Sequence, residues 1–295
     1  MQGKRTFSVI GNCQAPYLAN ALLSNKDFND QYTWVKIPPI HLIQRSDIHT
    51  YFEKLKELDL VIHQPVVDKK RFSEFETGNL RNQLTETLTL ICIPSCYFNG
   101  YFPTISTVSG IKTPADSVHD MGVFHAFDLG IPIQKTVELL YQKNIFYNRY
   151  YTERWQSAVT ALQQREIDAA VDIEVSNFIN ETGRHEILMN QFNHPKKKIF
   201  KFLSEKICET LGIEQSETRP QKDLDNIIWP VLPWVKDELR IHSQESEKLI
   251  VRGTEVSWEE FVSGSFKSYQ NMPAIQRNAC VKRNTQVRSL LEEAL

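Results

Sequence analysis

The sequence predicts an α/β fold, with a small parallel sheet of about four strands in the N-terminal third and a helix-rich remainder. In that third, short apolar β-branched runs alternate four times with longer amphipathic stretches, which is typical of βα units. The predicted strands are largely apolar on both faces, as expected for a sheet covered by helices on each side. From Gly130 onward, helical spacing dominates and strand patterns become scarce. Right-handed crossovers favour the flavodoxin-like strand order 2-1-3-4.

Four segments rich in apolar and β-branched residues are predicted to be the strands of this sheet. The second and the fourth are followed directly by proline, which has no N–H to donate to a sheet ladder and therefore ends a strand. The predicted strands are residues 6–10, 32–37, 58–63 and 88–93.

Apolar residues at helical spacing predict the helices that connect these strands. The first helix carries Pro16 in its first turn, where the missing N–H has no cost. Ser46 or Asp47 can cap the second helix. The predicted helices of this third are residues 15–24, 46–58 and 70–87.

Three further segments, residues 134–144, 153–170 and 195–211, show helical spacing. The last has Asn193 as a candidate N-cap and Gly212 beyond its end. A polar stretch at 214–225 then predicts a surface connection, and 227–235 combines tryptophans and prolines as an irregular buried segment. We therefore expect a main domain at residues 1–212 and an appendage at 213–295 that packs on it.

Composition excludes several classes of protein. The 34 basic and 36 acidic residues give a formal net charge of -2, so no general field attracts nucleic acid. Apolar runs are far shorter than a membrane span, and the first residues lack the pattern of a secretory signal, so we expect a cytoplasmic protein. The five cysteines are odd in number and dispersed, which favours reduced thiols.

The main chemical candidate is Cys13, within the string Gly11, Asn12, Cys13, Gln14 between the first strand and its helix. The N-terminus of a helix favours a thiolate, and its N–H groups can hold an oxyanion. The amide side chains of Asn12 and Gln14 can donate to developing negative charge or orient a substrate. The alternative is that Cys13 is a small buried apolar residue.

A nucleophilic thiol needs a base, and of the eight histidines only His63 ends a predicted strand. In the order 2-1-3-4 the first and third strands are neighbours, so Cys13 and His63 should face one crevice within hydrogen-bonding reach. Gln64 follows and can line the same crevice. The alternative is a histidine that only bonds a backbone carbonyl.

Two weaker candidates for substrate binding lie farther along the chain. His119 stands in an irregular stretch with Asp120, His125 and Asp128, where an acid can orient a base, or where the loop is simply solvated. Asn99 lies in the aromatic segment 95–103 after the fourth strand, and this segment either stacks on a flat ring or joins the core.

A basic cluster at the start of the helix predicted at 195–211 is a candidate phosphate site. His194, Lys196 and Lys197 would bind the phosphates, although a charged helix face often serves only solubility. Cys92 and Cys96 have no second ligand pair nearby, so no metal is predicted. The first βα turn has a single glycine, which argues against a dinucleotide site of the usual kind.

Four strings, IGNCQA, LDLVIHQ, IPSCYFNGYFP and NQFNHP, resemble the WcbI-type polysaccharide biosynthesis acetyltransferases over about the first 210 residues. The resemblance implies a coenzyme A binding protein of a capsular polysaccharide pathway, with a cysteine and histidine pair acting as in arylamine N-acetyltransferases. Cys13 and His63 match those motif positions. The first domain would then bind the coenzyme, and polysaccharide assembly enzymes would be candidate partners.

The resulting hypothesis is acyl transfer from acetyl-coenzyme A to a sugar hydroxyl, through an acetyl-cysteine or directly with His63 as base. Two alternatives remain. Water can replace the sugar, giving a thioesterase or carbohydrate esterase. The protein can also be a non-catalytic, coenzyme-binding regulator.

Overall fold

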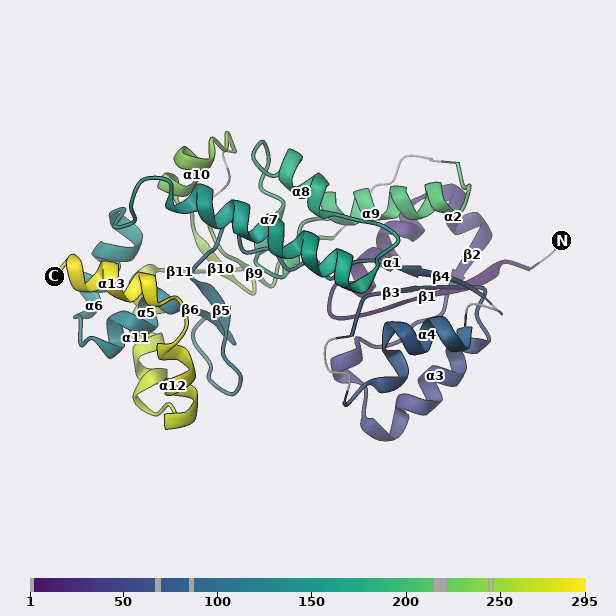
Figure 1. Cartoon of the computed structure of the whole chain (residues 1–295), viewed down its shortest axis with the longest axis horizontal. Coiled ribbons are helices and arrows are strands. Elements are labelled where there is room, and N and C mark those ends of the chain that lie inside the picture. Colours follow the sequence, from purple (N-terminus) through teal and green to yellow (C-terminus); the bar gives the residue numbers. More distant parts are fainter. Residues whose placement is uncertain (1–2, 67–69, 85–87, 215–221, 244, 246) are drawn as a thin grey trace. The chain divides into compact units, whose positions relative to one another are not determined.

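The structure is a computed structural model that describes residues 3–66, 70–84, 88–214, 222–243, 245 and 247–295 (Figure 1). Its contacts divide the chain into two compact units, each built from several chain segments. Unit 1 contains residues 1–97, 159–182 and 194–224, and unit 2 contains residues 98–158, 183–193 and 225–295. This division differs from the predicted boundary after residue 212, because residues 98–158 pack with the C-terminal part of the chain. Such long-range packing leaves no local pattern in a sequence.

A four-stranded parallel sheet forms the centre of unit 1, in the order β2-β1-β3-β4. The predicted fold class and strand order are therefore confirmed. The second strand is shorter than predicted, because the chain leaves the sheet before it reaches Pro38. The strands are β1 (Arg5–Ile10), β2 (Tyr32–Trp34), β3 (Leu60–His63) and β4 (Thr89–Cys92).

Helices cover both faces of this sheet (Figure 1). One face packs against α3 (Ile48–Lys56) and α4 (Thr77–Leu84), where Ile10 and Val61 join an apolar cluster with both helices. The other face of the sheet is covered by α1 (Ala15–Ser24), α2 (Lys26–Gln31) and α9 (Lys197–Thr210). The helix predicted at 70–87 is shorter, and residues 85–87 lie outside the described part. Three short 3-10 turns complete this part: η1 (Ile40–Leu42), η2 (Arg45–Asp47) and η3 (Ser73–Phe75).

The helix predicted at 195–211 is confirmed as α9, but it starts two residues later and its N-cap is Lys196, not Asn193. The start differs because His194 and Pro195 are extended and form the short strand β8 (His194–Pro195). The predicted end is confirmed, since Gly212 follows with a φ of 65°. The second half of α7 (Tyr150–Ala169) and α8 (Ser176–Thr182) also belong to unit 1.

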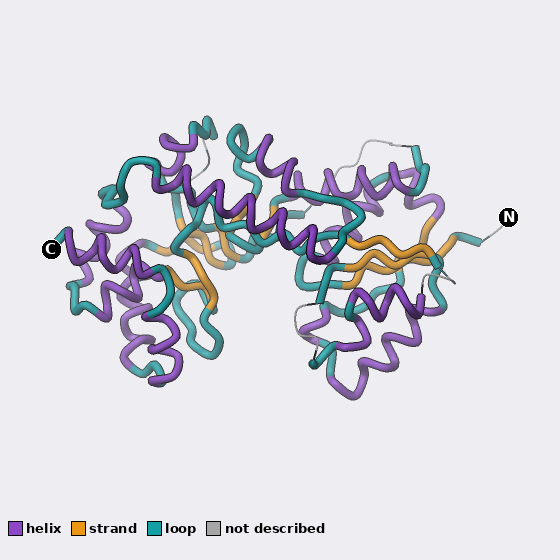
Figure 2. Tube along the Cα trace, in the orientation of Figure 1, coloured by secondary structure: helices purple, strands orange, loops and turns teal. Residues whose placement is uncertain are grey.

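Unit 2 combines helices with short antiparallel strands, which the sequence analysis missed (Figure 2). The irregular segment expected at 227–235 contains the first of the later strands and the start of a helix. The connection expected at 214–225 lies largely outside the described residues. The strands are β5 (Ile105–Thr107), β6 (Val118–Asp120), β7 (Met189–Gln191), β9 (Ile227–Ile228), β10 (Leu249–Val251) and β11 (Thr254–Val256).

The first half of α7 packs with the other helices of unit 2, and the predicted helix at 134–144 is an α-helical turn followed by a π-helical one. The helices are α5 (Met121–Asp128), α6 (Ile133–Val137), the π-helical η4 (Glu138–Gln142), α10 (Pro233–Leu239), α11 (Trp258–Gln270), α12 (Ala274–Val281) and α13 (Thr285–Glu293).

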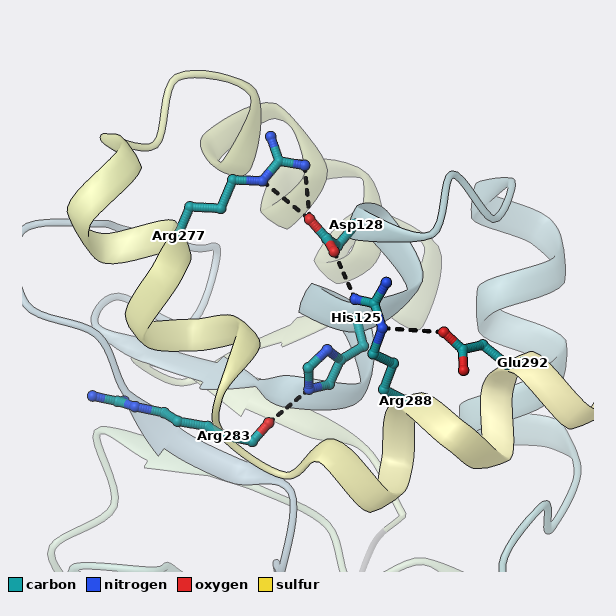
Figure 3. Close-up of polar contacts among 6 residues, drawn as sticks. All are labelled: His125, Asp128, Arg277, Arg283, Arg288 and Glu292. Atoms are coloured by element: carbon teal, nitrogen blue, oxygen red, sulfur yellow. Dashed lines mark hydrogen bonds and ion pairs between the residues drawn. The ribbon is translucent and has the colours of Figure 1, made fainter.

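Polar contacts fasten the C-terminal helices of unit 2 to α5 (Figure 3). Asp128 accepts hydrogen bonds from Arg277 of α12 and from Arg288 of α13, at 2.8 and 2.6 Å. His125 donates from Nε2 to the carbonyl oxygen of Arg283 at 2.7 Å. The predicted acid and base of this stretch are therefore engaged in holding helices together. None of the helices in the described ranges combines the length and the apolar character that a bilayer crossing requires.

Candidate functional site

The string around Cys13 forms the strand-to-helix turn that the sequence predicts. β1 ends at Ile10 and α1 begins at Ala15, so the turn lies at the carboxyl edge of the sheet. Cys13 is partly exposed, whereas the other four cysteines are buried. The only thiol that solvent partly reaches is therefore at the edge where open α/β sheets place their ligands.

Two buried glutamines fix this turn to the loop that follows β4. Gln64 Oε1 accepts from the Asn12 N–H at 3.0 Å, and its Nε2 donates to Gln14 Oε1 at 2.9 Å. Gln14 bonds both backbone groups of Cys96, each at 3.0 Å. Both amides make protein contacts and only 2% and 4% of the two residues' surface is exposed, so the predicted role of these glutamines in substrate binding stays a prediction.

The other two residues of the string have distinct roles. A Cβ at Gly11 would lie 2.3 Å from Gln64 Oε1, so only glycine admits the amide network. Asn12 accepts from the Gln14 N–H at 2.9 Å and donates from Nδ2 to Ser95 Oγ at 2.8 Å. Asn12 remains partly exposed, and its second Nδ2 hydrogen keeps it a candidate donor.

The N-terminus of α1 offers less to an oxyanion than the sequence suggests. The Ala15 and Tyr17 N–H groups donate within the turn, to Asn12 and Gln14 carbonyls at 3.1 Å, and Pro16 has no N–H. The Cys13 N–H faces its own sulfur. Burial raises the pKa of the Cys13 thiol, and this N–H offsets the rise only in part. The expected lowering of the thiol pKa is therefore not found.

His63 ends β3, as predicted, but its side chain is completely buried. In the sheet register it lies between Ile10 of β1 and Cys92 of β4, on the face that α3 and α4 cover. Neither ring nitrogen makes a hydrogen bond of normal geometry, and burial lowers the pKa of His63 to about 4, an effect that the Gln64 backbone opposes in part. The expected hydrogen bond to Cys13 is not formed, because the turn continues toward α1 on the opposite face.

The basic cluster lies beside the Cys13 turn. Tyr17 in the first turn of α1 stacks on Phe200 in the first turn of α9, with ring centroids 5.8 Å apart. Lys196 and Lys197 stand at that end of α9, although the Lys197 N–H donates to the Asp223 carboxylate. Burial lowers the pKa of the neighbouring His194 to about 4. The two helix starts thus bring the predicted thiol and the predicted phosphate site together.

The remaining candidates, Asn99 and His119, belong to unit 2. His119 is fully buried, donates from Nε2 to the Ile111 carbonyl at 3.2 Å and meets the Tyr269 hydroxyl with Nδ1 at 3.0 Å. Both ring nitrogens contact groups of the core, and the predicted role of His119 in substrate binding stays a prediction. Asn99 is partly exposed and accepts a turn hydrogen bond from Phe102. Its role in binding stays a prediction.

Unit 1 also contains a cavity of about 740 Å³ that the sequence does not predict. It lies beyond the carboxyl ends of β3 and β4, between α4 and the end of α7. Its polar lining includes Arg81, Ser95, Arg165 and Asp168. No local pattern predicts it, because its walls come from segments far apart in the chain. In the described part of the chain, no three histidine, cysteine or acidic side chains are grouped as a metal site.

Comparisons with known proteins agree with this architecture. A solved structure described as native WcbI, a novel polysaccharide biosynthesis enzyme, matches with a TM-score of 0.88 and 22% identity, over 99% of this chain and 100% of the other. That structure is described as lacking a disulfide bond between coenzyme A and one of its cysteines. No curated protein matches the chain. Residues 6–216 match the family model "Polysaccharide biosynthesis enzyme WcbI", and the chain belongs to the family of this polysaccharide biosynthesis enzyme.

Proposed function

We propose that the protein transfers an acetyl group from acetyl-coenzyme A to a sugar hydroxyl during the synthesis of a surface polysaccharide. The observation that carries this proposal is the partly exposed Cys13 on the turn after β1, beside the paired first turns of α1 and α9. A nucleophile and a cationic cluster at one edge suit a thioester donor that also carries phosphates.

The acyl donor would lie along the start of α9. Lys196, Lys197 and His194 would bind its phosphates, and its thioester would reach the Cys13 sulfur. The WcbI structure is described as being without a disulfide bond between coenzyme A and one of its cysteines, and this description pairs the coenzyme with a protein thiol, as the arrangement proposed for this chain does. Membership of the same family makes Cys13 the candidate for the corresponding sulfur.

In the proposed first step, His63 takes the thiol proton and Cys13 attacks the thioester carbonyl carbon. The backbone N–H of Cys13 and the side-chain Nδ2 group of Asn12 stabilise the oxyanion. The carbon–sulfur bond to coenzyme A then breaks, and its thiolate leaves with the proton from His63. In the second step the sugar hydroxyl attacks the carbonyl carbon of acetyl-Cys13 and His63 takes the hydroxyl proton. The carbon–sulfur bond to Cys13 then breaks, and the Cys13 thiolate takes this proton from His63 to restore the thiol.

His63 is the candidate base because it is neutral at physiological pH, although its pKa of about 4 makes it a weaker base than a solvated imidazole. The proposal requires the His63 ring to turn from the face of α3 and α4 toward the Cys13 turn when substrate binds, because the two side chains make no contact in this structure. Burial raises the pKa of the Cys13 thiol, so in this proposal the proton leaves the sulfur only as the thioester is attacked.

Calorimetric titration with coenzyme A, followed by an acetyl-transfer screen over neutral oligosaccharides, tests the proposal. Replacing both Lys196 and Lys197 by glutamate should weaken coenzyme binding about a hundredfold, since each lost cationic contact to phosphate costs about 1.5 kcal/mol. Lys206→Glu, farther along the same helix and away from its N-terminus, is the matched control and should bind normally.

Three results distinguish the alternatives. Acetyl transfer to an oligosaccharide supports the proposal. Steady acetate release without any sugar indicates an esterase. Tight coenzyme binding without turnover, unaffected by Cys13→Ser, indicates a regulatory protein.

A further inference from the structure

We propose that the cavity of about 740 Å³ in unit 1 binds the carbohydrate acceptor as a neutral pyranose ring. This inference rests on the proposed acetyl transfer, and it assigns the second substrate to a place that the phosphate cluster does not occupy. Three observations carry it: the position of the cavity, its balanced charge and its exposed aromatic ring.

The cavity adjoins the Cys13 turn through shared residues. Ser95 lines it and also accepts the hydrogen bond from Asn12 Nδ2 at 2.8 Å. Pro94, another wall residue, accepts a hydrogen bond from Gln64 at 3.3 Å. A ligand in the cavity would therefore lie against the same loop that fixes the turn of the nucleophile.

The charges of the lining balance. Arg81 and Arg165 are accompanied by Glu76 and Asp168, so the cavity has no excess of positive charge for a polyphosphate. Both arginines also donate to backbone carbonyls, Arg81 to Ala170 and Arg165 to Tyr97. Such a mixture of donors and acceptors matches sugar hydroxyls, each of which donates one hydrogen bond and accepts others.

Tyr97 provides the aromatic surface of the cavity. Its side chain is 39% exposed, and the Arg165 guanidinium lies over its ring at 5.7 Å from the centroid. The hydrogen bond from Arg165 to the Tyr97 carbonyl fixes the backbone that carries the ring. A positioned tyrosine can pack against the C–H face of a pyranose while the polar side chains bind its edge.

Saturation-transfer NMR with the methyl pyranosides of glucose, galactose and mannose tests this assignment directly. At least one should bind the wild-type protein at millimolar concentration. Tyr97→Ala should weaken that binding about tenfold, the equivalent of one lost aromatic contact. Ala169→Trp places an indole in the cavity and should abolish it. Tyr147→Ala removes a tyrosine of similar exposure, 38%, outside the cavity and should leave binding unchanged.

The coenzyme is measured in the same variants by calorimetry. Tyr97→Ala and Ala169→Trp should bind coenzyme A within about twofold of wild type, because substitutions remote from a ligand site have small effects. Circular dichroism confirms that each variant is folded, and Tyr97→Phe, which keeps the ring, should restore sugar binding.

Some results would overturn the inference alone: no pyranoside binds, binding survives Ala169→Trp, or the cavity variants lose coenzyme affinity. The last result would make the cavity part of the coenzyme site. Failure of the proposed function is seen separately, as an absence of coenzyme A binding by the wild-type protein.

Discussion

Two buried histidines, one in each unit, differ in a way that separates structure from candidate chemistry. His63 ends a strand of the unit 1 sheet, and His119 lies in the β5–β6 ribbon of unit 2. Both are completely buried, and in both burial lowers the pKa to about 4. His119 has partners for both ring nitrogens, whereas His63 has a partner for neither.

This difference shows that burial and a perturbed pKa do not identify a functional histidine. A buried polar group without a partner costs free energy, so its retention needs an explanation. For His63, the explanation that we propose is proton transfer at the adjacent edge of the sheet. For His119 the bonded nitrogens are explanation enough. The following predictions test this contrast, from the largest expected effect to the smallest.

The largest expected difference between the two histidines is in their effect on catalytic activity. His63→Gln should lower kcat for acetyl transfer by about 10²–10⁴-fold, the usual contribution of a general base. His119→Gln should leave kcat within about threefold of wild type, because its ring touches only the core of unit 2. Steady-state kinetics of the two variants measures this, and equal losses would remove the distinction between the histidines.

A second prediction concerns the amide network that holds the Cys13 turn. Gly11→Ala would force its Cβ against Gln64 and should cost about 1–3 kcal/mol of unfolding free energy, together with a loss of kcat. Gly3→Ala, where nothing lies within 4 Å, is the control and should change neither. Urea denaturation measures the unfolding free energies of the two variants, and steady-state kinetics measures their kcat. A Gly11→Ala protein with wild-type stability would show that the amide network is dispensable.

Substitution by leucine should destabilise the fold more at His119 than at His63, the reverse of the order expected for activity. His119→Leu leaves the Ile111 carbonyl and the Tyr269 hydroxyl without their partner and should destabilise the fold by about 1–2 kcal/mol. His63→Leu removes a polar group that has no partner, so its unfolding free energy should stay unchanged or increase. Chemical denaturation of both proteins provides the comparison. A larger loss for His63→Leu would show that His63 is a structural residue.

The last prediction, a dependence of folding stability on pH, applies to both histidines. Each has a native pKa of about 4, below the ordinary 6.5, so the unfolded chain binds more protons between these values. Stability is therefore full above pH 6.5 and is lost as the pH falls toward 4. At pH 5 each histidine should account for a loss on the order of 1–2 kcal/mol. Denaturation at several pH values should show a shallower slope in His119→Leu, and an unchanged slope would contradict the neutral buried state.

Sequence alone predicts the sheet of unit 1 and the position of its candidate residues. The apolar runs define the strands, and connection rules give their order, which places Cys13 and His63 at one edge. Side-chain direction is not predictable in this way. No sequence pattern shows that Gln14 and Gln64 turn toward each other, or that His63 joins the face of α3 and α4.

The short strands of unit 2 were missed for a different reason. Strands of two or three residues carry too little alternation to stand out from helical spacing. One signal was available: two short β-branched runs, Leu249–Val251 and Thr254–Val256, flank Arg252 and Gly253, and both of these adopt positive φ, as a tight hairpin turn requires.

The central claim is that Cys13 accepts the acetyl group with His63 as its base. The most direct measurement is mass spectrometry of protein that is rapidly quenched after mixing with acetyl-coenzyme A. We predict an acetyl adduct on the Cys13 peptide of the wild type and of His119→Gln, formed at least about a hundredfold more slowly in His63→Gln. Turnover without that adduct, or equal acetylation rates in all three proteins, would contradict the account.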